Sequence, residues 1–260
     1  MDKALSNDGT EIAFDRLGQG QAVVLVSGAS TGCAIHGSLA QLLSSGFTVF
    51  NYDRRGRGDS GDTQPYAVDR EIEDLAAVIA AAGGSALVFG NSSGAVLALR
   101  AAAAGLSISR LALWDPPFMV DPGAPQRQHE YLTKLTELLA EGRRGDAMAL
   151  FMTFIGLPLE MIDGMRRAPM WVGMEAVAPT LVYDAMVMGD STVPTRLVSS
   201  IKVPTLILTG GTSGVWADEA AKALLGALPS SQHRALEGQS HAVAWDVLGP
   251  ALKGYFSRRA

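Results

Sequence analysis

A nonapeptide near the middle of the chain constrains the fold more than any other stretch. The apolar run Ala86–Phe89 leads into Gly90-Asn91-Ser92-Ser93-Gly94, and a run of small residues with helical character, Ala95–Ala104, follows. The pattern G-x-S-x-G between a strand and a helix predicts a nucleophile elbow, a turn so tight that glycine is needed two residues before and after the serine. Such a turn lifts Ser92 Oγ above the strand end and points the Ser93 N–H toward the same place. The alternative is a glycine-bounded turn in which the serine caps the helix.

Length and composition fit a single α/β domain with a sizeable core. The chain has 260 residues, of which 48% are hydrophobic and 18% charged, and this length allows one domain with an inserted segment. The net charge of −5 argues against binding to nucleic acid or to acidic membrane surfaces, because both favour basic patches.

Cysteine usage and hydropathy point to an ordinary intracellular protein. The single cysteine, Cys33, excludes an internal disulfide, and no cysteine–histidine cluster has the spacing of a zinc site. No apolar stretch resembles a signal peptide or a membrane span. We therefore expect a cytoplasmic protein, monomeric or homodimeric.

Strand and helix patterns alternate along most of the chain, which is typical of a mostly parallel sheet flanked by helices. Short, continuously apolar runs predict strands that are buried on both faces. The predicted strands are Glu11–Arg16, Ala22–Val26, Phe47–Tyr52, Ala86–Phe89, Leu111–Trp114, Val203–Leu208 and His233–Leu236. The predicted helices are Tyr66–Ala82, Ala95–Ala104, Val215–Leu228 and Ala242–Phe256.

Between Pro116 and Ser199 the alternation stops and only helical patterns remain. They cover Gln126–Glu141, Asp146–Ile155, Leu159–Arg167 and Trp171–Met188. We therefore expect a core made of residues 1–116 and 200–260. Residues 117–199 would form a helical lid over the carboxyl ends of the strands, where ligands bind in such sheets.

The expected lid is rich in methionine and aromatic residues. Eight methionines lie between residues 148 and 188, and this flexible, polarizable side chain suits an adaptable apolar pocket wall. We expect Phe118, Met152 and Trp171 to contact a small hydrophobic substrate. The alternative is that these side chains fill the core between the lid helices.

One of the four histidines stands where a catalytic base is expected. His241 ends the loop Gly238-Gln239-Ser240-His241 after the last predicted strand, and from there it can reach the serine at the carboxyl edge of the sheet. The alternative is a histidine near a helix start that Ser240 caps. His36 and His233 lie near the starts of elements, and His129 lies in a lid helix where it would be solvated.

These segments, in this order, resemble the α/β-hydrolase family in its lid-bearing form. The matching pieces are Val23–Ala29, Asp53–Ser60, Gly90–Gly94 and Gly238–His241, and they span nearly the whole chain. The resemblance implies an α/β-hydrolase fold in which Asp53–Ser60 is an architectural loop, with Arg54, Arg55 and Arg57 fixing the loop rather than binding phosphate. It also implies a second oxyanion N–H after the strand Ala22–Val26, from Ala29 or, one residue earlier, from Gly28.

The third member of the expected triad departs from the common family pattern. Most relatives carry an aspartate just after the strand equivalent to Thr205–Leu208, but here the loop 209–214 has no carboxylate. Asp115 directly follows the preceding strand, and haloalkane dehalogenases and the fungal zearalenone lactonase take the acid from this position. We therefore expect Asp115 to orient His241 and to stabilise its imidazolium form. Asp218, in a predicted helix, is the alternative acid, and a strand-end cap is the alternative role for Asp115.

A serine nucleophile implies an acyl-enzyme, formed from an ester, lactone, thioester or amide without a cofactor or a metal. We expect a hydrophobic carboxylic ester or lactone as substrate, with the N–H groups of Ala29 and Ser93 holding the tetrahedral oxygen. The same fold also serves perhydrolases, acyltransferases, carbon–carbon hydrolases, small-molecule receptors and non-catalytic binding proteins. Labelling by a fluorophosphonate with multiple turnover of esters would indicate an enzyme, and a single turnover would indicate a receptor.

Overall fold

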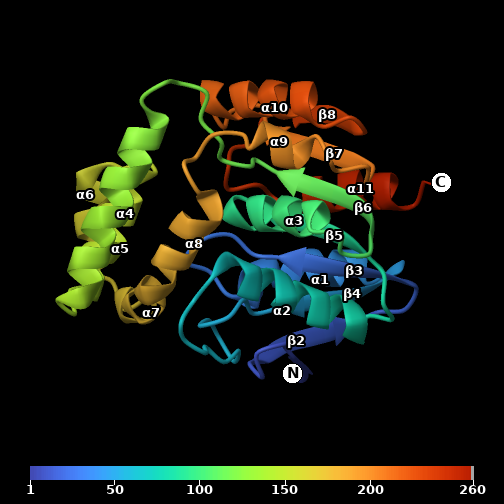
Figure 1. Ribbon diagram of the computed structural model, residues 1–260, viewed down its shortest axis with the longest axis horizontal. Coiled ribbons are helices and arrows are strands. Elements are labelled where there is room, and N and C mark those ends of the chain that lie inside the picture. The colour runs from blue at the N-terminus through green and yellow to red at the C-terminus, as the bar shows by residue number, and fades with distance from the viewer. Residues whose placement is uncertain (259–260) are drawn as a thin grey trace.

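Residues 1–258, which the computed structural model describes, form one sheet with helices on both faces (Figure 1). The eight strands of this part of the chain lie in the order β1-β2-β4-β3-β5-β6-β7-β8. The β1–β2 and β2–β4 pairs are antiparallel and all the others are parallel. The bounds are β1 (Asp2–Leu5), β2 (Glu11–Leu17), β3 (Gln21–Val26), β4 (Phe47–Tyr52), β5 (Ala86–Asn91), β6 (Ile108–Trp114), β7 (Thr205–Gly210) and β8 (Ser231–Leu236). This is the mostly parallel sheet that the apolar runs predict.

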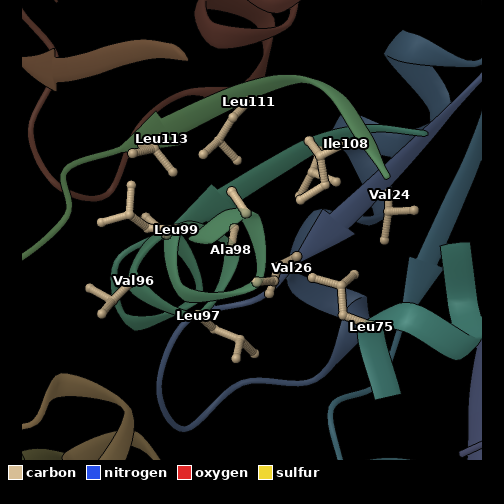
Figure 2. Close-up of a cluster of buried hydrophobic side chains, with 14 of the residues drawn as sticks. Val24, Val26, Leu75, Val96, Leu97, Ala98, Leu99, Ile108, Leu111 and Leu113 are labelled. Carbon is tan, nitrogen blue, oxygen red and sulfur yellow. The ribbon is translucent and has the colours of Figure 1, made fainter. Parts of the chain in front are cut away.

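Alternating side chains of the central strands supply a separate core on each face of the sheet. The covering helices are α1 (Gly37–Leu43), α2 (Val68–Ala81), α3 (Ser93–Ala103), α10 (Val215–Ala227) and α11 (Trp245–Phe256). Val24 and Val26 of β3 belong to the core that also contains residues of α2, α3 and α10, and Figure 2 shows part of this core between α3 and the strands. Val23 and Leu25 face the other way, toward α1 and α11. Because both faces are covered, the central strands are mostly apolar rather than alternating between polar and apolar residues.

The segment between β6 and β7, residues 117–199, is called the insertion from here on. Its helices are α4 (Ala124–Ala140), α5 (Arg144–Phe154), α6 (Leu159–Arg166), α7 (Trp171–Val177), α8 (Leu181–Met188) and α9 (Thr195–Val198). Helices α4 to α8 share a core of their own, and Figure 1 shows α4 to α7 grouped at the end of the sheet toward which β6 points. That this helical segment works as a lid stays a prediction.

Some elements differ from those that the sequence predicts. The expected single helix Trp171–Met188 is interrupted by the 3-10 turn Ala178–Thr180, because Pro179 has no N–H with which to continue a helix. The strand β1, the helix α1, the 3-10 helix Cys33–His36 and the short α9 have no counterpart in the prediction. None of the helices in residues 1–258 combines the length and the apolar character needed to cross a bilayer.

The parallel strands end at one common edge of the sheet, and the sequence motifs lie just beyond it. Gly28 follows β3, Ser92 follows β5, and Asp115 follows β6. The loop 211–214 follows β7, and His241 lies in the loop after β8. In the strand order, β3 lies between β4 and β5. After β3 the chain forms β4 on one side of it and then crosses over to form β5 on the other side, so the strand order changes direction at β3. Ligands of parallel sheets bind at the carboxyl edge, at such a switch point.

Candidate active site

Ser92 lies in a strained turn between β5 and α3. Its φ of 54° and ψ of −128° fall in a region that residues other than glycine rarely adopt, and such a conformation costs on the order of 1–3 kcal/mol. Packing requires both flanking glycines. A Cβ on Gly90 would collide with the carbonyl oxygen of Gly94, and a Cβ on Gly94 would collide with the carbonyl oxygens of Val26 and Ser27. The turn therefore has the geometry that its sequence motif predicts.

Asp115 and His241 meet directly beyond β6. Asp115 follows the last residue of that strand, is fully buried and has a φ of 40°. Its Oδ2 lies 3.1 Å from Nδ1 of His241. A hydrogen bond from Nδ1–H to a carboxylate fixes the imidazole tautomer and leaves Nε2 as the free base. Asp218, by contrast, is exposed on α10, so the carboxylate that the fold brings to His241 is that of Asp115.

The end of β7 holds the Asp115 carboxylate from a second side. The Gly210 N–H donates to Oδ1 over 3.1 Å, and the Ser213 hydroxyl donates to Oδ2 over 2.6 Å. Both oxygens therefore accept hydrogen bonds, which fixes the orientation of the group toward His241. Ser213 lies in the loop that lacks the usual acid, and nothing in this run of small residues singles it out in the sequence.

His241 is held through its backbone and by a neighbouring tryptophan. Trp114 Nε1 donates to the His241 carbonyl oxygen over 3.1 Å. The Trp216 ring meets the imidazole edge-on, with ring centroids 5.6 Å apart. The side chain of His241 is 44% exposed, so it is open to a ligand. Its one side-chain hydrogen bond in the described residues goes to Asp115; in unliganded sites the bond between nucleophile and base is often long and shortens when substrate binds.

Two backbone segments flank Ser92. A Cβ on Gly28 would lie 3.1 Å from Ser92 Cβ and 3.2 Å from the Asn91 carbonyl oxygen, so the loop after β3 runs directly against the elbow. Ser93 begins α3, and the first N–H groups of a helix have no acceptor within that helix. Ala29, the next residue of the loop, is partly buried. These segments are the ones from which the sequence predicts an oxyanion hole.

Comparison with known proteins identifies the family. The sequence model of the alpha/beta hydrolase family matches residues 23–247. The chain belongs to the alpha/beta hydrolase family. It is 54% identical to an alpha/beta hydrolase from Sphaerobacter thermophilus, whose crystal structure matches with a TM-score of 0.92 over 98% of this chain and 100% of that one.

Two further proteins that are similar to this alpha/beta hydrolase, one in sequence and one in fold, have named activities. N-formylmaleamate deformylase of Pseudomonas putida is 28% identical over 248 residues, 92% of this chain and 87% of the relative. The enol-lactonase from Burkholderia xenovorans shares the fold, with a TM-score of 0.74 at 20% identity over 99% of this chain and 100% of that one. The fold is thus common to proteins that cleave different bonds.

A second histidine of this alpha/beta hydrolase, His36, lies against the residue that precedes Ser92. Its Nε2 is 3.0 Å from Asn91 Oδ1, and its ring meets Phe89 and Trp245 edge-on. Complete burial lowers the pKa of His36 to about 4, so the ring is neutral at pH 7 and Nε2–H donates to the amide oxygen. The sequence predicts only that His36 lies near the start of an element, and nothing in it indicates the contact with Asn91.

The remaining two histidines lie elsewhere. His233 Nε2 lies 2.9 Å from the hydroxyl oxygen of Thr209, and His129 is exposed on α4. Within residues 1–258, neither of them forms a hydrogen bond to Ser92 or Asp115. His129 is therefore the solvated residue of the insertion that the sequence predicts.

The three side chains predicted to contact substrate are all buried in packing. Phe118 belongs to the core on the α3 face of the sheet, whereas Met152 and Trp171 belong to the core of the insertion. Trp171 Nε1 also donates to Glu175 Oε1 over 2.8 Å. This is the core-filling role that the sequence offers as the alternative, and a substrate contact for any of the three stays a prediction.

The arginines of the loop 53–60 are buried in ion pairs. Arg54 pairs with Glu71, Arg55 with Asp74, and Arg57 with Asp184, at 2.6 to 2.7 Å. They hold the loop from inside, as the family resemblance implies. Within residues 1–258, no group of three or more histidine, cysteine, aspartate or glutamate side chains is arranged to hold a metal ion.

Proposed function

We propose that this chain is a serine hydrolase that cleaves a hydrophobic carboxylic ester or lactone through an acyl-enzyme on Ser92. The observation that carries the proposal is the hydrogen bond between His241 Nδ1 and the buried Asp115 carboxylate, at the same sheet edge as the Ser92 elbow. A nucleophile, a base and a carboxylate that orients the base are the three roles that acyl transfer to serine requires.

The proposed reaction has two half-reactions. His241 Nε2 takes the proton of Ser92 Oγ as that oxygen attacks the carbonyl carbon, while Asp115 keeps Nδ1 protonated and stabilises the imidazolium. The N–H groups of Ser93 and Ala29 donate to the oxyanion of the tetrahedral intermediate. The imidazolium then protonates the leaving alkoxide. In the second half-reaction the same base activates a water molecule, which hydrolyses the acyl-enzyme and frees Ser92.

A second candidate function is hydrolysis of an N-formyl amide by the same route. The observation in its favour is the similarity to N-formylmaleamate deformylase along 92% of this chain. A formyl group is the smallest acyl group, so its transfer to Ser92 needs little room beside the elbow. A nitrogen that carries a second acyl group also leaves more readily than that of an ordinary amide.

The nucleophile is tested with Ser92→Ala, a variant that removes one oxygen. We expect the wild type to react with a fluorophosphonate and to turn over p-nitrophenyl butyrate repeatedly. The variant should keep its circular dichroism spectrum and lose labelling, with kcat/KM reduced on the order of 10⁴-fold or more. More than a few per cent of wild-type activity in Ser92→Ala would overturn the proposal, and a single turnover by the wild type would favour a receptor. The ranking of kcat/KM among an ester, a lactone and N-formylmaleamate decides between the two substrate classes.

The acid is tested by comparing Asp115→Asn with Asp218→Asn. An asparagine at 115 permits the wrong histidine tautomer, so kcat should fall by up to about 10⁴-fold, as for the corresponding aspartate of serine proteases. Asp218→Asn alters an exposed side chain on α10 and should leave kcat within about twofold of wild type. Collapse of kcat in Asp218→Asn alone would transfer the role of acid to that residue.

A further inference from the structure

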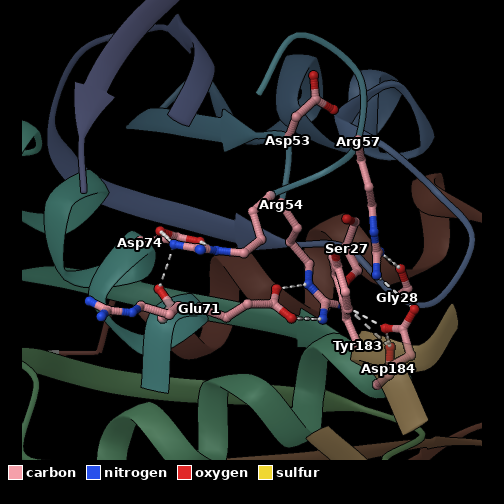
Figure 3. Close-up of polar contacts among 12 residues, drawn as sticks. Ser27, Gly28, Asp53, Arg54, Arg57, Glu71, Asp74, Tyr183 and Asp184 are labelled. Atoms are coloured by element: carbon pink, nitrogen blue, oxygen red, sulfur yellow. Dashed lines mark hydrogen bonds and ion pairs between the residues drawn. The ribbon is translucent and has the colours of Figure 1, made fainter. Parts of the chain in front are cut away.

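A carboxylate from the insertion reaches into the core of the molecule next to the elbow. Asp184, on α8, is 4% exposed. Its Oδ1 accepts from the Ser93 hydroxyl over 2.7 Å and from Arg54 Nη1 over 2.8 Å. Its Oδ2 accepts from Arg57 Nη2 over 2.7 Å. One side chain of the insertion therefore binds the residue after Ser92 and two arginines of the loop 53–60. Figure 3 shows Asp184 together with Arg54 and Arg57.

The other arm of Arg57 fixes the loop that runs against Ser92. Arg57 Nη1 donates to the Gly28 carbonyl oxygen over 2.6 Å and to the Thr31 carbonyl oxygen over 3.3 Å. The Gly28 carbonyl and the Ala29 N–H belong to one planar trans peptide, so they point in opposite directions. A guanidinium that holds the carbonyl oxygen therefore also sets the direction of the Ala29 N–H.

Charge balance makes Asp184 the counter-ion of Arg57. Arg54 is bound through two parallel hydrogen bonds to Glu71, at 2.6 and 2.7 Å, and a bidentate pair of this kind is balanced in itself. Asp184 is the carboxylate that pairs with Arg57, and both side chains are buried. Burial alone would raise the pKa of Asp184, but Arg57 and Arg54 lower it below its ordinary value, so the carboxylate is ionised.

We propose that Asp184 and Arg57 are positioning residues for the oxyanion hole. Arg57 aims the Ala29 N–H through the Gly28 carbonyl, and Asp184 fixes Arg57 and the Ser93 side chain together. A single carboxylate of the insertion thereby fixes the two segments that carry the oxyanion donors, the N–H groups of Ala29 and Ser93, relative to each other. This inference rests on the proposed function of Ser92 and predicts loss of transition-state binding without comparable loss of substrate binding.

The experiment compares two variants with a matched control. Asp184→Asn removes the charge, and Arg57→Lys keeps a charge but places one nitrogen where two are needed. The control is Asp74→Asn, because Asp74 is as buried as Asp184 and forms a 2.7 Å ion pair with the equally buried Arg55. All three variants weaken the same kind of pair, and only the first two act on the loop beside Ser92.

The readouts are kcat, KM and inhibition by a trifluoromethyl ketone that mimics the ester. Ser92 Oγ adds to this ketone, its proton passes to His241, and the resulting oxyanion occupies the hole. We expect Asp184→Asn and Arg57→Lys each to lower kcat about 10- to 100-fold, somewhat less than the loss of a whole oxyanion donor. KM should stay within about threefold, and the inhibition constant should rise by the same factor by which kcat falls. Asp74→Asn should keep kcat and the inhibition constant even where its melting temperature drops.

The folded variants decide the question. If Asp184→Asn does not fold, Arg57→Lys decides the question alone. A folded variant that matches Asp74→Asn in kcat, or that loses kcat while binding the ketone as tightly as wild type, would show a merely structural role. Ser92→Ala is measured in the same assay. If it retains turnover, the proposed function fails and the positioning role falls with it; if it is inactive, only the positioning role is at stake.

Discussion

At the residue scale, the Asp115 carboxylate depends on three donors from two segments of the chain, residues 210–213 and the loop after β8. His241 comes from the loop after β8, Gly210 from the end of β7, and Ser213 from the loop that follows. Ser213 and His241 share the same oxygen, Oδ2. The serine hydroxyl therefore restrains the carboxylate oxygen that faces the imidazole.

Removal of the Ser213 hydroxyl should slow catalysis without abolishing it. A hydrogen bond to a charged group contributes about 1.5–3 kcal/mol. We expect about half of this to appear in the barrier, so Ser213→Ala should lower kcat roughly 4- to 13-fold. The control is Thr212→Ala, because the hydroxyl of Thr212 bonds the Gln239 carbonyl oxygen over 2.9 Å rather than Asp115. Steady-state kinetics of the two variants should differ; equal kcat values would mean that Ser213 plays no part in holding the acid.

His36 should make the stability of the protein depend on pH. Burial lowers the pKa of His36 from 6.5 to about 4, so between these values the unfolded chain binds a proton that the folded chain does not. Stability contributed by the neutral ring is complete above about pH 6.5, falls as the pH drops and levels off below about pH 4. The loss from this residue is about 3 kcal/mol in the free energy of unfolding.

Urea denaturation at pH 7 and pH 4.5 measures this contribution. His36→Gln cannot titrate and should flatten the pH dependence over this interval, whereas His129→Gln, at an exposed position, should retain the wild-type slope. An identical slope in all three proteins would contradict the assignment of a neutral buried imidazole.

At the element scale, Gly94 at the start of α3 has no room for a larger side chain, whereas Gly254 near the end of α11 has room for one. A Cβ at position 94 would collide with backbone oxygens of Val26 and Ser27, and backbone atoms of a central strand cannot move aside. Gly94→Ala should therefore destabilise the protein by about 1–3 kcal/mol or more. At the exposed Gly254 of α11 a Cβ would meet nothing within 4 Å, so Gly254→Ala should stabilise it by up to about 1 kcal/mol. Equal unfolding free energies for the two alanine variants would refute this account of the elbow.

The elements buried on both sides are the ones that sequence patterns predict best. β4 has the predicted bounds, Phe47–Tyr52, because all six of its residues are buried and four of them are large and apolar or aromatic. β1 escapes prediction because three of its four residues are exposed and it pairs only with β2. α1 escapes because it is short and begins at Gly37, a residue that ordinarily signals a loop.

The candidate site divides in the same way. Ser92, His241 and Asp115 can be located from local motifs and strand ends, because the carboxyl edge of a parallel sheet gathers whatever follows its strands. The residues that hold these three in place cannot be located from the sequence. Ser213 bonds to Asp115, which is 98 positions away in the sequence, and Arg57 bonds to Asp184, which is 127 positions away. No periodicity or short motif records such pairs, since they depend on how the insertion and the loops pack.

At the scale of the whole molecule, the site is assembled from both sides of the insertion. Ser92 and Asp115 precede it in the chain, whereas Ser213 and His241 follow it. The strands that precede the insertion contact those that follow it where β6 pairs with β7. The hydrogen bonds to Asp115 join the same two parts of the chain. Formation of the site therefore requires that residues 200–258 have already docked on the first half of the sheet.

Asp184 also limits how freely the insertion can be exchanged. A chimera that received residues 117–199 from another family member would strand the buried Arg57 unless the donor segment carried a carboxylate at the same place, and an unpaired buried charge is strongly destabilising. The insertion and the loop 53–60 are therefore coupled through Arg57 and Asp184, which lie 127 residues apart in the sequence. An engineered graft of the insertion should therefore either supply a carboxylate at the place of Asp184 or be transplanted together with the loop 53–60.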